Sequence, residues 1–292
     1  MSADLHCHTK MSDGSVEADE IVLIAAQSGI PVISVTDHDT FSGSDRAEMM
    51  GEKHGVRVIP GAEFSTTDPL TGRKAHILCY FCKNPRHLEN LCVRMREERS
   101  RAAELMIRKV TEIYPVTKEM ILRRAKGGTV VYKQHIMHAL MDAGCADEFY
   151  GTVYHRLFNS RDGLAYAPVH YPDVHEVTAR IREAGGIAVL AHPGEYDSYA
   201  LLEQLAQDHE IDGVETWHPK NREGDEQRFS ETAGKYGLIM TGGTDFHGMY
   251  RKKGTPLGTC TTPDDQLEKL IGLGARRAGL SQQWREYLDV SL

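Results

Sequence analysis

Two short motifs place metal-binding side chains at alternate positions. His6 and His8 form an H-x-H near the start of the chain, and Asp245 and His247 form a D-x-H near its end. In a β-strand, alternate side chains share a face, so both members of each pair can address one point. Imidazole and carboxylate together suit zinc, manganese or iron. The two motifs therefore predict a metal site, and a metallohydrolase is the class of protein that they favour.

Further metal-ligand residues follow apolar runs in the sequence, namely His38, Glu63 and His192. A single histidine after a strand is more often a surface or core residue than a ligand. That interpretation would have to hold independently at five strand ends, which disfavours it. Asp13, in the first loop, and His76, early in an apolar run, are less secure, because their spacing fits a ligand and a non-ligand equally well.

Strand-like runs alternate with amphipathic helical stretches over most of the chain. The expected strands are Ala3–His8, Val32–Thr36, Arg57–Gly61, Ala75–Phe81, Ile187–Ala191, Gly213–Thr216 and Leu238–Thr241. The expected helices between them are Ala18–Ser28, Ser42–Lys53, Asp173–Ala184, Tyr199–Asp208 and Gly224–Lys235. This alternation is typical of a parallel α/β sheet, and seven strands favour an irregular barrel. Barrel active sites lie at the C-terminal strand ends, where all the candidate ligands except His76 fall.

One interval breaks the alternation. Residues 86–167 read as helical, with Arg94–Ile113, Thr117–Lys126 and Lys133–Ala143 as the clearest pieces. We predict a small helical insertion (cap) domain here, above a catalytic barrel domain formed by residues 1–85 and 168–292. Lys133 and His135 begin one of these helices, and a helix N-terminus with basic side chains suits a phosphate. A solvated helix start explains the same pattern equally well.

Composition narrows the class of protein. With 292 residues and 40% hydrophobic content, the chain can bury one large core. A net charge of −8 disfavours a general nucleic-acid coat, although residues 86–133 hold twelve Lys/Arg against six Asp/Glu. That local excess fits either a solvated helix face or a surface that faces a phosphate. The cysteines are scattered, and the sequence shows neither an apolar run of transmembrane length nor a signal-peptide pattern. We therefore expect a cytoplasmic protein with no membrane partner.

Taken together, the motifs resemble a known family. They read Asp4-Leu5-His6-Cys7-His8 with Ser12-Asp13-Gly14, Val35-Thr36-Asp37-His38, Gly61-Ala62-Glu63, Ala191-His192-Pro193 and Gly243-Thr244-Asp245-Phe246-His247. This set, which spans the chain except for the insertion, is similar to the PHP (polymerase and histidinol phosphatase) domain family. The resemblance implies a distorted seven-stranded β/α (TIM-like) barrel with three divalent metal ions. It is closest to the branch with a helical insertion, which acts on nucleotide phosphates and short oligonucleotides.

The resemblance also implies which residues bind the metals. By this comparison one metal is held by His6, His8, Glu63 and Asp245; a second by Glu63, His76 and His192; and a third by Asp13, His38 and His247. Glu63 would bridge two of the ions. An aspartate at position 13, where some relatives have histidine, gives a harder site that favours manganese or iron over zinc.

The predicted activity is hydrolysis of a nucleotide phosphomonoester by metal-activated hydroxide, with Glu63, His192 and Asp245 as catalytic residues. The expected substrates are a 3′,5′-nucleotide bisphosphate, an AMP-like compound or a short oligoribonucleotide, with no obligate protein partner. In the resembling branch a basic residue followed two positions later by histidine occupies the region of Lys133 and His135, so we assign these two residues to a second phosphate. Tyr166 is a weaker candidate for contact with a base or sugar.

Other functions stay open at this point. Histidinol-phosphate phosphatase is the main rival within the class. An amidohydrolase-type deaminase or amidase is disfavoured, because Glu63 stands where that family commonly has a carboxylated lysine. The third alternative is a non-catalytic metal-binding module. Asp37 and Asp39 flank His38, where they would either orient imidazoles or cap the following helix.

Overall fold

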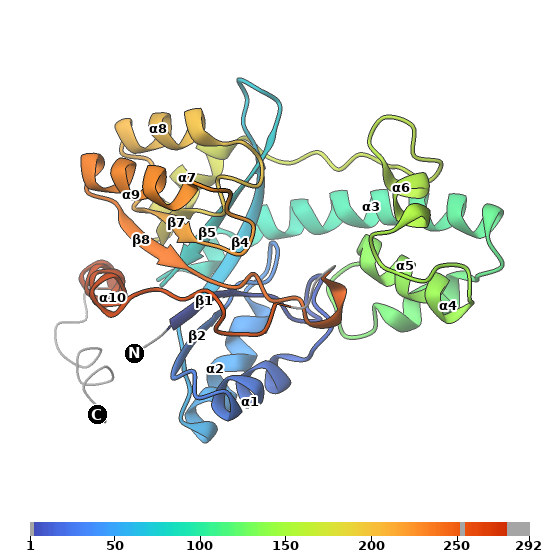
Figure 1. Ribbon diagram of the computed structural model, residues 1–292, viewed down its shortest axis with the longest axis horizontal. Helices are drawn as coiled ribbons and strands as arrows, with labels where there is room; N and C mark the ends of the chain where they lie inside the picture. The colour runs from blue at the N-terminus through green and yellow to red at the C-terminus, as the bar shows by residue number, and fades with distance from the viewer. Residues whose placement is uncertain (1–2, 252–254, 279–292) are drawn as a thin grey trace.

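The computed structural model describes residues 3–251 and 255–278, and its strands form two sheets (Figure 1). The three-stranded sheet has the order β1-β2-β3 and the five-stranded sheet the order β4-β5-β6-β7-β8. The strands are β1 (Ala3–Cys7), β2 (Val32–Val35), β3 (Arg57–Val58), β4 (Gly61–Thr67), β5 (Lys74–Tyr80), β6 (Ile187–Leu190), β7 (Gly213–Trp217) and β8 (Ile239–Gly242). Isolated bridges join the two sheets at two places: His38 pairs with Glu63 in β4, and Cys7 pairs with Phe246 just after β8, so both edge strands of the five-stranded sheet are involved.

Helices cover the outer faces of both sheets. The α-helices are α1 (Ala18–Gln27), α2 (Ser42–His54), α3 (Glu89–Ile113), α4 (Lys118–Arg124), α5 (Lys133–Asp142), α6 (Thr152–Phe158), α7 (Val174–Glu183), α8 (Tyr199–Gln207), α9 (Asp225–Tyr236) and α10 (Asp264–Ala278). The 3₁₀ turns are η1 (Pro85–His87) and η2 (Gly248–Tyr250). Helices α1 and α2 pack on the three-stranded sheet, and α7, α8 and α9 pack on the five-stranded sheet. The α/β class predicted from the alternation of strands and helices is therefore confirmed.

The predicted set of seven parallel strands differs from the structure at the third strand. Strand β3 ends at Val58, and β4 begins at Gly61, directly after Pro60, which has no backbone N–H for a ladder. Strand β4 then forms an antiparallel hairpin with β5, and β5 is also antiparallel to β6. Within the described residues there are eight strands in two sheets, so a closed seven-stranded barrel is not confirmed.

The hairpin explains the placement of His76. Because β5 runs opposite to its neighbours, its N-terminal end lies beside the C-terminal ends of the parallel strands. His76 pairs in register with Ser65 of β4, and its carbonyl accepts a hydrogen bond from Ala191, just after β6. The one ligand candidate that seemed misplaced in the sequence is thus at the same edge as the others.

Helices α3 to α6 form a separate lobe, shown in green at the right of Figure 1. They lie between β5 and α7 and share an apolar cluster of their own, which includes Met106, Ile136, Leu140 and Phe158. Helix α6 lies within the interval predicted to be helical, although it was not among the pieces named there. At the other end of the chain, residues 279–292, which the prediction assigned to the barrel domain, lie outside the described residues.

Candidate metal centre

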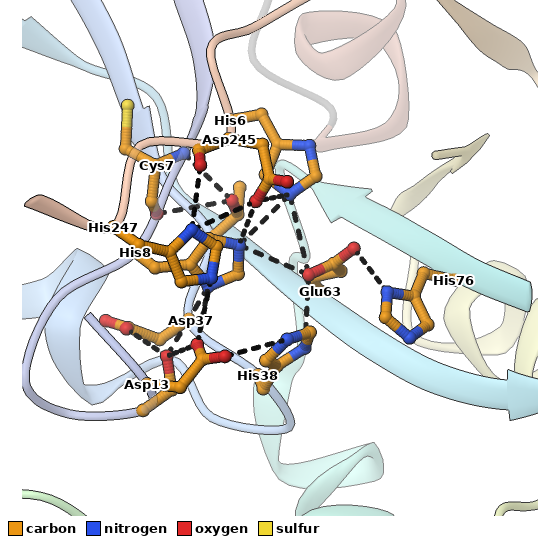
Figure 2. A network of polar contacts seen from close by, with 12 residues as sticks. His6, Cys7, His8, Asp13, Asp37, His38, Glu63, His76, Asp245 and His247 are labelled. Carbon is orange, nitrogen blue, oxygen red and sulfur yellow. Dashed lines mark hydrogen bonds and ion pairs between the residues drawn. The ribbon is translucent and has the colours of Figure 1, made fainter. Parts of the chain in front are cut away.

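The predicted metal ligands meet in one cluster where the two sheets join (Figure 2). His6 lies in β1, Glu63 in β4 and His76 in β5, whereas the others follow strand ends: His8, Asp13, His38, His192, Asp245 and His247. The described residues contain four groups of three or more ligand side chains whose nearest donor atoms lie within 4.8 Å of one another. The sequence motifs therefore converge in space as the strand-end argument expected.

Glu63 is at the centre of this cluster. Its Oε2 lies 3.4 Å from His6 Nε2, 3.3 Å from His8 Nε2 and 3.1 Å from His38 Nδ1. Its Oε1 lies 2.8 Å from His76 Nδ1 and 2.9 Å from His192 Nε2. The two oxygens thus face different sets of imidazoles, which is the geometry that a bridging carboxylate requires.

Electrostatics at Glu63 favour its charged form. Burial alone would raise the pKa of this carboxyl, but the imidazoles of His76, His38 and His6 outweigh burial and hold the pKa well below its usual range. Among the ligands, Asp13 and Asp245 are buried with it. Such buried carboxylates are stable only beside compensating positive charge.

The donor set fits divalent cations. His6 Nε2 and His8 Nε2 face each other at 3.1 Å, and both also face Glu63. The buried Nδ1 of His192 has no hydrogen-bond partner among the described residues. Neutral imidazoles and carboxylates with inward-facing lone pairs are the donors that Zn, Mn and Fe accept. When bound, such ions would supply Lewis acidity and an activated water.

Three residues beside the ligand cluster have a strained backbone. His192 has φ +27°, Asp245 has φ +49°, and Asp39, next to His38, has φ +57°. Positive φ is costly for residues other than glycine, by about 1–3 kcal/mol each. Gly243 is required for a different reason, because a Cβ there would overlap His6.

Glu215 is a functional residue that the sequence analysis missed. It lies in β7 and is fully buried. Its Oε1 is 2.9 Å from His6 Nδ1, and its Oε2 accepts a hydrogen bond of 2.8 Å from the backbone N–H of His192. One carboxylate therefore orients two predicted ligands.

Asp245 is held by two partners that the sequence analysis also did not assign. The guanidinium of Arg251 contacts its Oδ2, and His218 Nε2 lies 3.4 Å from the same oxygen. In the structure His218 is buried beside the metal cluster.

Within the described residues, Asp37 and Asp39 form no direct hydrogen bond with an imidazole and do not cap α2. Asp37 binds the first loop through Thr9 N, Thr9 Oγ1 and Ser12 Oγ at 2.8, 2.6 and 2.6 Å. Asp39 pairs with Arg99 of α3 at 2.8 Å. These two aspartates fix the loops on either side of the cluster.

A cavity of about 570 Å³ opens above the cluster. Its lining combines the metal-ligand candidates with cations and tyrosines of the lobe, including Lys133 and Tyr166, two of the predicted substrate-binding residues. His135 does not line it. His135 instead accepts a hydrogen bond of 3.1 Å from Tyr132 N, and burial lowers its pKa to about 4. Gln134 takes its place on the cavity wall and donates to Asp13 at 3.1 Å.

Three cations of this lining lie close together. Burial, with the nearby charges of Lys74 and Arg99, lowers the pKa of Lys133 to about 8. Arg99 is neutralised by Asp39, but within the described residues neither lysine pairs with a carboxylate. Buried imidazoles and carboxylates below a cavity with a cationic wall define a metal-dependent hydrolase of anionic substrates.

Comparison with known proteins identifies the family. The PHP domain model matches residues 4–128. A phosphoribosyl 1,2-cyclic phosphate 1,2-diphosphodiesterase from Eggerthella lenta is 37% identical over 252 residues, covering 86% of this chain and 95% of the relative. A 3′,5′-nucleoside bisphosphate phosphatase from Chromobacterium violaceum is 25% identical over 255 residues, covering 84% of this chain and 86% of the relative. A solved structure from Bifidobacterium adolescentis, assigned as a metal-dependent phosphoesterase, is 28% identical with a TM-score of 0.84, covering 93% of this chain and 96% of that chain.

The chain belongs to the PHP domain family, as its motifs predicted, and is a metal-dependent phosphoesterase. In the part of the chain that the structure describes, no helix is both long and apolar enough to cross a membrane.

Proposed function

We propose that the enzyme hydrolyses a ribose-based ester that carries two phosphate groups. One phosphate would lie at the metal centre and the other against Lys74 and Lys133. The observation that carries this proposal is the cavity itself, whose lining contains both the ligand cluster and the two lysines without carboxylate partners. Like charges brought together in a protein wall are stabilised by a bound anion.

Aromatic rings accompany these lysines. Lys74 Nζ lies 5.2 Å from the ring centre of Tyr171, and Lys133 Nζ lies 5.6 Å from that of Tyr166. Such rings can also stack on a base or sugar. Tyr166 therefore keeps its proposed role beside Lys133, whereas the buried His135 is better interpreted as a support for the helix start that presents Lys133.

The two named relatives support a doubly phosphorylated ribose. The Eggerthella lenta protein is named for a phosphoribosyl cyclic phosphate and the Chromobacterium violaceum protein for a nucleoside 3′,5′-bisphosphate. Both names describe ribose with two phosphates. We therefore propose a ribose with two phosphates as the substrate. The predicted nucleotide bisphosphates belong to this class.

For the cofactor we propose three divalent cations, Mn, Fe or Zn, in the predicted ligand sets. The groups His8–Asp13–His38–His247, His6–His8–Glu63 and His38–Glu63–His76 support three adjacent positions. Glu63 would hold two ions together through its separate oxygens. His192 and Asp245 line the same cavity and are the proposed proton carriers to the leaving oxygen.

The helical lobe, residues 86–167, would act as a cap that selects the substrate. Its helix α3 contacts the catalytic part through Arg99, which donates to Asp39 and, at 2.7 Å, to Ser65. Helix α5 supplies Lys133 and Gln134 to the cavity wall. Substrate choice would then depend on the lobe and bond cleavage on the strand ends.

A turnover screen of the metal-loaded enzyme tests this proposal. The panel holds phosphoribosyl 1,2-cyclic phosphate, a nucleoside 3′,5′-bisphosphate, AMP, short RNA, histidinol phosphate and an aryl phosphate. We expect kcat/KM for one of the doubly phosphorylated riboses to exceed that for the aryl phosphate at least about 100-fold, which corresponds to roughly 2.7 kcal/mol for the second anion. Equal turnover of histidinol phosphate would contradict the proposal and favour the rival phosphatase.

A further inference from the structure

Tyr132 is held rigidly beside the metal centre. It precedes α5, it lines the cavity, and it is only 7% exposed. Its ring stacks on that of His38, with 6.3 Å between centroids and 23° between planes. The guanidinium of Arg99 lies over the same ring at 5.0 Å and is itself fixed by Asp39. The direction of the Tyr132 side chain is therefore determined by several contacts at once.

The Tyr132 hydroxyl is chemically unusual in this setting. It is buried and has no hydrogen-bond partner among the described residues. Two other tyrosines of the cavity differ: the Tyr150 hydroxyl accepts from Gln134 at 3.3 Å, and the Tyr250 hydroxyl lies 2.9 Å from His138 Nδ1. An unsatisfied buried hydroxyl costs about 1–3 kcal/mol. Phenylalanine would keep every ring contact without that cost, so packing alone does not explain the hydroxyl.

We propose that the Tyr132 hydroxyl donates a hydrogen bond to a non-bridging phosphoryl oxygen of the ester at the metal centre. This role rests on phosphoester hydrolysis at the strand ends. A bond forms between water oxygen and phosphorus, the bond to the leaving oxygen breaks with its electron pair, and a proton from water ends on that oxygen. The Tyr132 proton stays on its own oxygen. Negative charge on the phosphoryl oxygens is greater in the transition state than in the bound ester. A hydrogen-bond donor that faces such an oxygen therefore stabilises the transition state more than the bound ester.

The test is Tyr132→Phe in the metal-loaded enzyme. Loss of one such donor typically lowers kcat about 100- to 1,000-fold, and we expect KM to change less than about threefold. Inhibition by vanadate, which mimics the transition state, should weaken far more than binding of inorganic phosphate. Metal content should be unchanged, and Tm should be equal or higher, because an unpaired hydroxyl has been removed.

Tyr199→Phe is the matched control. It removes a hydroxyl that donates to Asp225 at 2.8 Å, outside the cavity lining, and should leave kcat and vanadate inhibition unchanged. Three results would overturn the proposal: kcat of Tyr132→Phe close to that of the wild type, equal weakening of vanadate and phosphate, or a loss of activity that tracks a loss of metal. If the wild type hydrolysed none of the doubly phosphorylated riboses, the proposed substrate would be wrong, and the vanadate comparison would still test Tyr132.

Discussion

Replacing Glu215 by glutamine tests how the ligand cluster is oriented. Both carboxylate oxygens accept hydrogen bonds, one facing His6 Nδ1 at 2.9 Å and the other the His192 N–H at 2.8 Å. Glutamine has nearly the same shape, but it offers one oxygen and one NH₂ group. The substitution therefore changes hydrogen-bond polarity with little change in volume.

Either orientation of the amide harms the site. If its NH₂ group faces the His192 N–H, two donors meet at about 2.8 Å. If it faces His6 Nδ1, that nitrogen must accept, and the proton moves to Nε2, the atom that faces His8 and Glu63. A protonated Nε2 cannot bind a metal. Loss of such an orienting partner typically weakens metal affinity about 10- to 100-fold, which is about 1.4–2.8 kcal/mol.

The assay is metal competition against a chromophoric chelator, with Glu203→Gln as the control. Glu203 lies on α8, outside the cavity lining, and binds Lys235 and Tyr236 at 3.1 and 3.0 Å on the surface. Its substitution should leave metal affinity unchanged. If Glu215→Gln bound metal within about twofold of the wild type, the orienting role derived from these two bonds would be refuted.

Four further predictions concern charge and metal binding. Lys133→Ala should raise KM for a doubly phosphorylated ribose far more than for an aryl phosphate; equal effects on both substrates would remove Lys133 from recognition. Since Lys133 is charged below its pKa of about 8, kcat/KM for the same substrate should fall as pH rises through 8, and a pH profile of Lys133→Ala should lack this step. Glu63→Gln should lower both metal content, measured by elemental analysis, and turnover, because one bridging oxygen becomes an NH₂ group; unchanged values for both would contradict the bridging role. Removal of metal by a chelator should lower Tm by about 5–15 °C, since saturating ligand contributes several kcal/mol to stability; an unchanged Tm would show that the cluster holds no ion.

The convergence of the ligands was predictable because it depends on short-range patterns. His6 and His8 share a strand face by alternation, and Asp245 and His247 follow a later strand. The rule that C-terminal strand ends of an α/β sheet meet at one edge then places them together. No long-range detail of packing is needed for that step.

Other features depend on contacts that the sequence does not display. Glu215 is a single carboxylate in a short strand, and its partner His6 lies 209 positions away. The turn of β4 into an antiparallel hairpin with β5 follows from pairing between strands, and it alone explains why His76 joins the site. His135 looked available at a helix start, whereas in the structure its Nδ1 accepts a hydrogen bond from the Tyr132 backbone N–H. For each of these residues, the local sequence predicted a plausible position but could not predict which distant residue it contacts.

The positive φ values at Asp39, His192 and Asp245 have a consequence for the folding landscape. At these three positions the local preference of the backbone opposes the native geometry, so local and global preferences conflict beside the candidate metal centre. Glycine there would relax the backbone but would remove the Asp39 contact with Arg99 and two of the predicted metal ligands, His192 and Asp245. Backbone preference alone would favour glycine at these positions, so the contacts of the side chains, and not the backbone, explain the residues that are present.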